Sequence, residues 1–172
     1  MRKHPTLFIL IVAICLQSCC FYGDCDDEFD DDPLAFSQYE PVFLSREVLE
    51  ASVQLSEPED IITSGKIYLK DNLLFINEKR KGFHVFDNSN PEQPVKLKFI
   101  EVPGATDLAV RGNILYINQA TDLIPAEYNA SSNTLSVTKR VADMFPELPS
   151  PDGYFAYDIP AGSIVVDWKL KN

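Results

Sequence analysis

Few side chains in this sequence could do chemistry. His84 is the only histidine besides His4. On an alternating strand it lies opposite Phe83 and Val85, so we expect it at the surface or rim of a sheet. One histidine without a neighbouring cysteine excludes His-based triads, Cys/His dyads and His-rich metal sites. We therefore predict no catalytic, metal-binding or cofactor-binding residue.

Two further polar groups are expected to be solvated. Asp122 and Glu127 could form a carboxylate pair, but two acids on a strand and loop are mostly solvated rather than catalytic. The basic triplet Lys79-Arg80-Lys81 indicates an exposed hairpin tip, with contact to an anionic surface polysaccharide as the alternative. The sequence contains neither a glycine-rich phosphate loop nor a Gly-x-Ser-x-Gly motif.

The N-terminal residues predict export and lipid attachment. The apolar run 7–16 rises about 1.5 Å per residue and covers about half of a bilayer core, which indicates a secretory signal rather than a membrane span. It ends in Leu16-Gln17-Ser18-Cys19, which resembles the lipobox of bacterial lipoproteins. The resemblance implies that residues 1–18 are a cleaved signal peptide. It also implies that Cys19 carries acyl chains such as palmitate and anchors the protein in the outer membrane.

Cys20 fits the lipobox less well, because Gln17 would then stand three positions before the modified cysteine. An ordinary signal peptide with incidental cysteines is the alternative interpretation. After cleavage, Cys20 and Cys25 lie in an oxidising compartment and could close one small disulfide loop.

An acidic segment follows the lipobox. Residues 24–32 hold seven acidic side chains in nine positions, and such a run stays extended and solvated. It resembles the export tag that sends Bacteroidetes lipoproteins to the outer face of the outer membrane. We expect residues 19–38 to form a lipidated tether that is exposed at the cell surface. A calcium loop of the EF-hand type would need a glycine in its middle and a glutamate at its end, and the run has neither.

The composition favours an all-β fold. Of 172 residues, 12 are proline, 11 phenylalanine and 7 tyrosine, which suits many turns and short strands better than a helical bundle. The formal net charge of −11 argues against a nucleic-acid partner, since phosphate contacts need clustered lysine and arginine.

An internal repeat organises the predicted β domain, residues 39–172. The stretch 67–77 aligns without a gap with 108–118, at an offset of 41 residues and with four identities in eleven positions. Asp71-Asn72 and Gly112-Asn113 are expected to be two-residue hairpin turns, because asparagine and glycine tolerate positive φ.

Each unit is completed by two further strands. In the first unit these are 83–86 and 95–102, and in the second 123–128 and 135–141. We predict two four-stranded, blade-like repeats, at about residues 61–104 and 105–143. A strand at 39–44 and a short helix near residues 45–52, capped by Ser45, precede them.

The first unit resembles a known family. Gly65-Lys66-Ile67-Tyr68, the turn Asp87-Asn88-Ser89-Asn90-Pro91 and the later Pro103-Gly104 are similar to LVIVD-repeat proteins of Bacteroidetes cell surfaces. The second unit is less similar, because Pro125 interrupts its third strand and 129–133 replaces the Asp-x-Ser-Asn-Pro turn. The resemblance spans about residues 39–145 and implies a partial β-propeller on a surface lipoprotein, with no established activity.

The tail, residues 144–172, is expected to add one strand at 164–168. The resemblance implies that longer family members continue into further blades here, so the chain would be a short member, a truncated product or a piece that needs a partner. Two blades do not close a ring, for which about four are the usual minimum, so an edge or face of the last sheet should stay exposed.

Two functions remain open. The first is a non-catalytic surface domain that binds protein or glycan, which a flat apolar face near Trp168 would favour. The alternative is a carboxylate-dependent hydrolase, or a subunit of a surface enzyme. A pocket with two carboxylates about 5–9 Å apart and aromatic side chains beside them would favour it.

Overall fold

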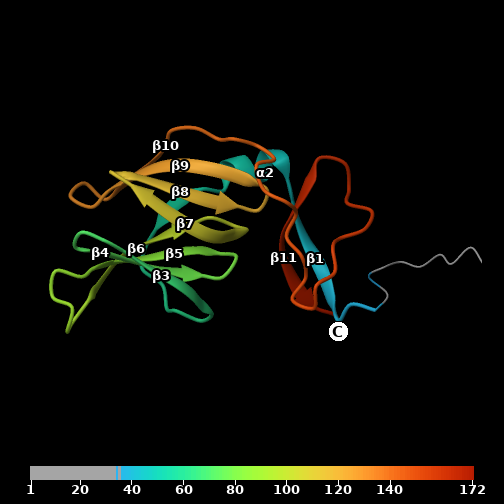
Figure 1. The fold of residues 1–172 in the computed structure, drawn as a ribbon, viewed down its shortest axis with the longest axis horizontal. Coiled ribbons are helices and arrows are strands. Elements are labelled where there is room, and N and C mark those ends of the chain that lie inside the picture. Colours follow the sequence, from blue (N-terminus) through green and yellow to red (C-terminus); the bar gives the residue numbers. More distant parts are fainter. Residues whose placement is uncertain (1–33, 35) are drawn as a thin grey trace, which may run out of the picture. The chain divides into compact units, whose positions relative to one another are not determined.

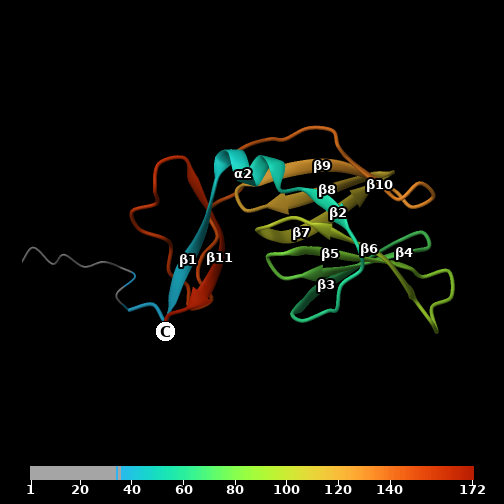
Figure 2. The ribbon, with the colours of Figure 1, turned by 180° about the vertical axis from the view of Figure 1, so that it is seen from behind.

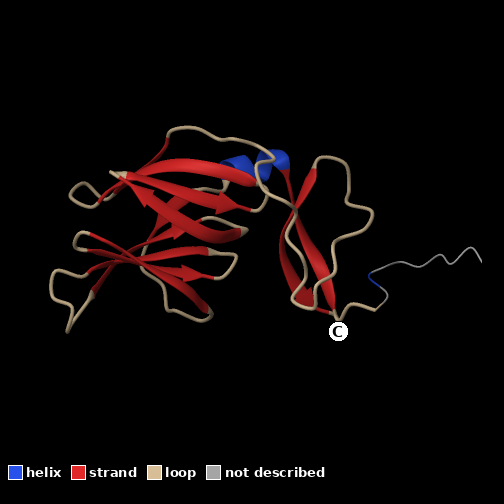
Figure 3. Ribbon diagram, viewed as in Figure 1, coloured by secondary structure: helices blue, strands red, loops and turns tan. Residues whose placement is uncertain are grey.

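The computed structural model describes residue 34 and residues 36–172. Antiparallel strands dominate this part of the chain and form three sheets, beside one short α-helix (Figure 1, Figure 3). The predicted all-β fold class is therefore confirmed. The predicted signal peptide, Cys19 and the acidic run lie outside the described residues.

The short helix predicted near residues 45–52 is present. β1 (Tyr39–Ser45) leads into α2 (Arg46–Ala51). The Ser45 side chain accepts a hydrogen bond from the Val48 backbone N–H at 3.3 Å, and Glu47 lies in the first turn. This capping satisfies a backbone donor that the helix itself leaves unpaired.

The first sheet is a meander with one added strand. Its spatial order is β2-β6-β5-β4-β3. The strands are, in chain order, β2 (Gln54–Ser56), β3 (Ser64–Lys70), β4 (Leu73–Glu78), β5 (Gly82–Asp87) and β6 (Val95–Glu101). Four of them match the predicted unit. The three residues of β2 lie before the repeat and add a fifth strand at the outer edge of β6.

The second sheet has the same meander with four strands, in the order β10-β9-β8-β7. They are β7 (Ala105–Arg111), β8 (Ile114–Gln119), β9 (Asp122–Asn129) and β10 (Thr134–Val137). Both expected hairpin turns are present. Lys70 pairs with Leu73 and Arg111 with Ile114, and the first turn residues, Asp71 and Gly112, have positive φ.

The two sheets pack face to face around one core. Figures 1 and 2 show them stacked when seen from opposite sides. The core holds Phe75, Phe83, Val85 and Ile100 from the first sheet and Leu108, Leu115, Ile117 and Ile124 from the second. We call these sides the inner faces and the opposite sides the outer faces.

The inner faces of the two sheets are not equivalent in the repeat. With the offset of 41 residues, Leu108 corresponds to Ile67 and Ile117 to Ile76, and both of these lie on the outer face of the first sheet. The second sheet therefore packs with the face that the first sheet leaves outward. Stacking is head to tail, as in repeat proteins whose units contact only their neighbours.

A third, two-stranded sheet joins distant parts of the chain. β1 pairs along its whole length with β11 (Ser163–Leu170), so that Tyr39 lies opposite Leu170 (Figure 1). A second core forms on it from Leu49, Ala120, Leu148, Ile164, Val165, Val166 and Trp168. The predicted strand at 164–168 is thus present and slightly longer.

The folded part extends a little into the predicted tether. Ser37 is buried, and its hydroxyl lies 3.0 Å from Asp152 Oδ1. The Gln38 backbone N–H also donates to Asp152, at 2.8 Å. Residues 37 and 38 therefore belong to the domain rather than to a solvated linker.

Candidate functional site

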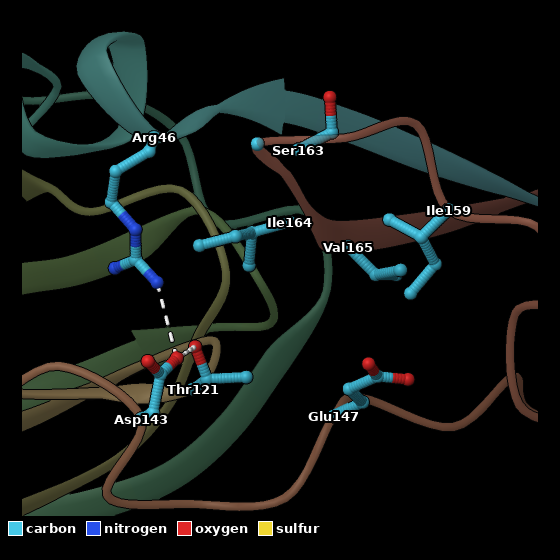
Figure 4. Close-up of a pocket in the computed structure, with 9 residues that line it drawn as sticks. Arg46, Thr121, Asp143, Glu147, Ile159, Ser163, Ile164 and Val165 are labelled. Carbon is cyan, nitrogen blue, oxygen red and sulfur yellow. Dashed lines mark hydrogen bonds and ion pairs between the residues drawn. The ribbon is translucent and has the colours of Figure 1, made fainter.

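A pocket of about 310 Å³ lies where α2, the β8–β9 turn and β11 meet (Figure 4). We call it the Arg46 pocket. Its apolar lining comes from Ile159, Ile164 and Val165. Its polar lining comes from Arg46, Thr121, Asp143, Glu147 and Ser163, and Gly162 lies just before β11.

Local structure holds Arg46 at this pocket. It is the first residue of α2, and its backbone N–H donates to the Gly162 carbonyl at 2.8 Å. On the opposite side, the Thr121 carbonyl accepts from the Phe145 N–H at 2.9 Å, which fixes the tail beside the β8–β9 turn. Side chains from three separate stretches of sequence are thereby brought together.

Asp122 is the centre of an ion cluster next to the pocket. Its side chain is fully buried, and Oδ2 lies 2.6 Å from Nη1 of both Arg46 and Arg140. Oδ1 accepts from the Asp143 backbone N–H at 3.2 Å and from the Thr121 hydroxyl at 3.2 Å. A buried carboxylate is tolerated only when it is paired and hydrogen-bonded in this way.

Electrostatics make Asp122 a weak base. Burial opposes its ionisation, but the hydrogen bonds from Arg46, Arg140 and the Asp143 N–H outweigh burial and lower its pKa. Arg46 also pairs with Asp143, at 3.1 Å. Its positive charge is therefore shared by two carboxylates of the same chain.

The contacts of Asp122 are those of a buried structural ion cluster. The Thr121 hydroxyl lies beside Asp122, whose lowered pKa makes it a poor proton acceptor for activating a nucleophile. The pocket wall holds two carboxylates, Asp143 and Glu147, but its lining has no aromatic side chain. It therefore lacks part of the arrangement that would favour the hydrolase interpretation.

The carboxylate pair Asp122 and Glu127 is not formed. Asp122 begins β9 and pairs with Gln119, whereas Glu127 pairs with Ile114 at the other end of the strand and is exposed. Of the two, the prediction of a solvated acid is correct for Glu127 and wrong for Asp122. The cause is that Arg46 and Arg140 come from outside the sheet to cover it.

The prediction of a surface or rim position for His84 was wrong. Only 2% of its side chain is exposed, and its ring lies 4.8 Å from that of Phe99, measured between centroids. Nε2 lies 3.1 Å from Glu78 Oε2. Its strand face was predicted correctly, but the segment before β3 is held beside it, because Ile62 and Thr63 bind the same carboxylate of Glu78 as His84 does.

Glu78 explains why this buried pair is stable. Its carboxylate accepts from the backbone N–H groups of Ile62, at 2.9 Å, and Thr63, at 2.5 Å. Burial opposes ionisation, but these hydrogen bonds and the one from His84 outweigh it and lower the pKa of Glu78. Glu78 and His84 therefore hold the segment before β3 against the sheet, and both oxygens of the Glu78 carboxylate are used in these hydrogen bonds.

The basic triplet is not uniformly solvated. Lys79 and Lys81 are exposed as predicted. Arg80, however, pairs with Asp167 at 3.2 Å and donates to the Pro149 carbonyl at 3.0 Å. The sequence could not show that the tail folds back against this turn.

Trp168 does not mark an exposed apolar face. It is buried, and its indole N–H donates to the Leu148 carbonyl at 3.0 Å. Exposed apolar side chains occur at Phe155 and Tyr157 in the tail and at Leu170, the last residue of β11. On β3, Ile67 is 63% and Leu69 is 68% exposed. Ile61 and Ile62, in the segment leading into β3, are exposed as well.

Ile67 and Leu69 occupy repeat positions that face the core in the second unit. Their counterparts, Leu108 and Val110, lie in or against the core between the sheets. We call Ile67 and Leu69, with the half-buried Leu74 and Ile76 beside them on β4, the β3 patch. No motif search detects this patch, because the same residue types at the same repeat positions are core in one unit and surface in the other.

Comparisons with known proteins complete the description. Neither protein-family models, nor curated proteins, nor solved structures match this chain. Among the residues described by the structure, no helix is long and apolar enough to cross a membrane.

Proposed function

We propose that this protein is a lipid-anchored cell-surface protein whose β domain binds another protein without catalysing a reaction. The observation that carries the proposal is the β3 patch, where two large aliphatic side chains are about two-thirds exposed side by side on an edge strand. Contiguous apolar surface at positions that are core elsewhere in the same repeat indicates an interaction site.

The chemistry of the patch favours a protein over a glycan. Ile67, Leu69, Leu74 and Ile76 present only hydrocarbon. Sugar hydroxyls placed against such a surface would lose water without gaining hydrogen bonds, which is costly. Apolar side chains of a protein partner would gain free energy from the same contact.

The two stacked sheets are best understood as propeller-like blades of the LVIVD kind. Support comes from the shared meander order, the hairpin turns and the head-to-tail packing. A blade in the middle of such a stack has both faces covered. The β3 patch on the outer face of the first sheet is then the surface that a neighbour would cover.

The anchor is proposed from the lipobox sequence at Cys19 and the acidic residues that follow it. We expect metabolic labelling with a palmitate analogue to mark the full chain, and Cys19→Ala to remove the label, while Cys20→Ala keeps it. Protease added to intact cells should degrade the domain if it faces outward. Unchanged labelling of the Cys19→Ala variant would contradict the anchor.

Photo-crosslinking tests the interaction role directly. Benzoylphenylalanine placed at position 69 of the full chain in its native cells should give a discrete protein adduct under light. Position 95 is the matched control, because Val95 is 57% exposed in the same sheet but outside the β3 patch. A protein adduct at 69 and none at 95 is expected. Absence of a protein adduct at 69, or adducts with soluble glycan only, would overturn the proposed function.

A further inference from the structure

We infer that the partner of the β3 patch is a second copy of this chain, bound head to tail through the outer face of its second sheet. This inference rests on the proposed function and adds the identity of the partner and the face it uses. It is argued from the packing that the chain already makes within itself.

The contact between the two sheets of one chain indicates which kind of surface could bind the β3 patch. Leu108 and Val110 pack against a surface formed by Tyr68, Phe75, Phe83 and Val85 of the first sheet. Ile67 and Leu69 are the counterparts of Leu108 and Val110. A surface equivalent to that of Tyr68 and Phe75 would therefore fit the β3 patch.

The chain has such a surface on its second sheet. Tyr68 corresponds to Ala109, Phe75 to Tyr116 and Val85 to Pro125, since Ala109, Tyr116 and Pro125 pair in one row as their counterparts do. All three lie on the outer face of the second sheet, with Ala109 exposed and the other two half-buried. A second copy therefore offers the counterparts of these three residues to the β3 patch.

A hollow on this outer face leaves room for side chains of the partner. It measures about 290 Å³ and is lined by Asp107, Leu108, Ala109, Tyr116, Asn118, Leu123 and Phe145. Ala109 stands where the first sheet has the larger Tyr68, which leaves part of this hollow open. Phe145 covers one end and forms a rim of the hollow.

The charges of Lys66 and Asp107 would also be complementary between two copies stacked in this way. Within one chain, Lys66 Nζ lies 2.5 Å from Asp107 Oδ2, and the Tyr68 hydroxyl also donates to Asp107. Lys66 and Asp107 are separated by the repeat offset and so occupy equivalent positions. Repeating the stack places Asp107 of one copy beside Lys66 of the next. Both side chains are about half exposed or more and accessible to a second partner, at 65% and 48%.

The resulting interface joins two different faces. Such a heterologous contact closes into a ring or continues as a filament, unlike a two-fold dimer in which one face meets itself. Crosslinking can distinguish the two arrangements. In a head-to-tail contact, a crosslinker on β3 of one copy reacts with the second sheet of another copy, whereas in a two-fold dimer it reacts with β3.

The test uses two differently tagged full-length copies in the same cells. One carries benzoylphenylalanine at position 69, and the other carries the second tag. We expect an adduct that contains both tags, with the crosslinked peptide mapping within residues 107–125 of the second copy. Ala109→Arg in the second copy should reduce this adduct by roughly tenfold, as about 1.4 kcal/mol of lost binding free energy would.

Val137→Arg in the second copy is the matched control, because Val137 is also exposed on the second sheet but lies on β10. It should leave the adduct unchanged. An adduct mapping to residues 67–76 of the second copy would show a two-fold contact and overturn the inference. An adduct with a different protein would overturn it as well while sustaining the proposed function, and absence of any protein adduct would overturn both.

Discussion

At the scale of single residues, the stability of the domain depends on two buried carboxylates, Asp122 and Glu78. Asp122 has no exposed surface and takes hydrogen bonds from two guanidinium groups, one from α2 and one from the segment after β10. Glu78 does the same for two backbone N–H groups and His84. Each of these groups ties a segment outside the meander to the sheet.

Removing the charge of Asp122 should destabilise the fold. We expect Asp122→Asn to lower the free energy of unfolding by about 3 kcal/mol, because Arg46 and Arg140 would keep their charges beside a neutral amide. Urea unfolding at neutral pH measures this. The control is Glu127→Gln on the same strand, which is exposed and should change stability by less than about 0.5 kcal/mol. Equal effects of the two variants would contradict the role of the cluster.

The same carboxylate should make stability depend on pH. The pKa of Asp122 is lower in the folded state than its ordinary value of 3.8, so folding favours its ionised form. Its stabilisation is then present above about pH 4 and is lost as the pH falls through the folded-state value. The stability difference between the native chain and Asp122→Asn should shrink between pH 6 and pH 3. A difference that stays constant over this range would exclude the linkage.

At the scale of strands, Pro125 is accommodated within β9 beside the point where β10 ends. The strand runs through it unbroken, which corrects the expected interruption. Its carbonyl accepts from the Thr138 N–H at 2.9 Å, so its nitrogen, which has no hydrogen, also points toward β10. β10 ends at Val137, and pairing resumes only between Leu123 and Val141. The interruption falls on the fourth strand instead of the third.

Glycines in the two units should respond differently to substitution. At Gly82, where φ is +150°, a Cβ would lie 2.0 Å from the Ile100 carbonyl oxygen. We expect Gly82→Ala to separate β5 from β6 and to cost about 2–4 kcal/mol. Gly112 also has positive φ but open space around it, so Gly112→Ala should cost about 1 kcal/mol. Thermal or urea unfolding of both variants checks the order, which would be contradicted if Gly112→Ala were the more damaging change.

At the scale of the whole domain, two cores are connected rather than independent. Leu49 of α2 and Ala120 of the β8–β9 turn pack in the core of the β1–β11 sheet. Arg80 of the first sheet pairs with Asp167 of β11, and Arg46 joins α2 to Asp122. These contacts join the β1–β11 sheet and α2 to both of the stacked sheets.

Trp168 is the single tryptophan and reports on the β1–β11 core. We expect its fluorescence change on urea unfolding to coincide with the loss of the far-UV circular dichroism signal, because the linked cores unfold together. Two separated midpoints, with fluorescence changing first, would show that β1–β11 unfolds as an independent unit.

Local sequence by itself determined the fold class, the hairpins at Asp71 and Gly112, the Ser45 helix cap and most of the strands. These depend on period-two alternation, turn residues and capping, which act over a few neighbouring residues. The repeat also predicted that an apolar sheet face would need a neighbour. It placed the exposed edge or face on the last sheet, whereas the β3 patch lies on the first sheet.

Only the tertiary structure decided which of these residues are buried. His84, Asp122 and Arg80 depart from the sequence prediction for one reason: segments distant in the sequence, namely Ile62 with Thr63, Arg46 with Arg140, and Asp167 with Pro149, are held beside them. Conversely, Ile67 has the pattern of a core residue and is exposed, because its repeat counterpart Leu108 has a sheet packed against it and Ile67 does not. Burial is a property of the assembled chain, and a strand's own residues do not specify what will cover them.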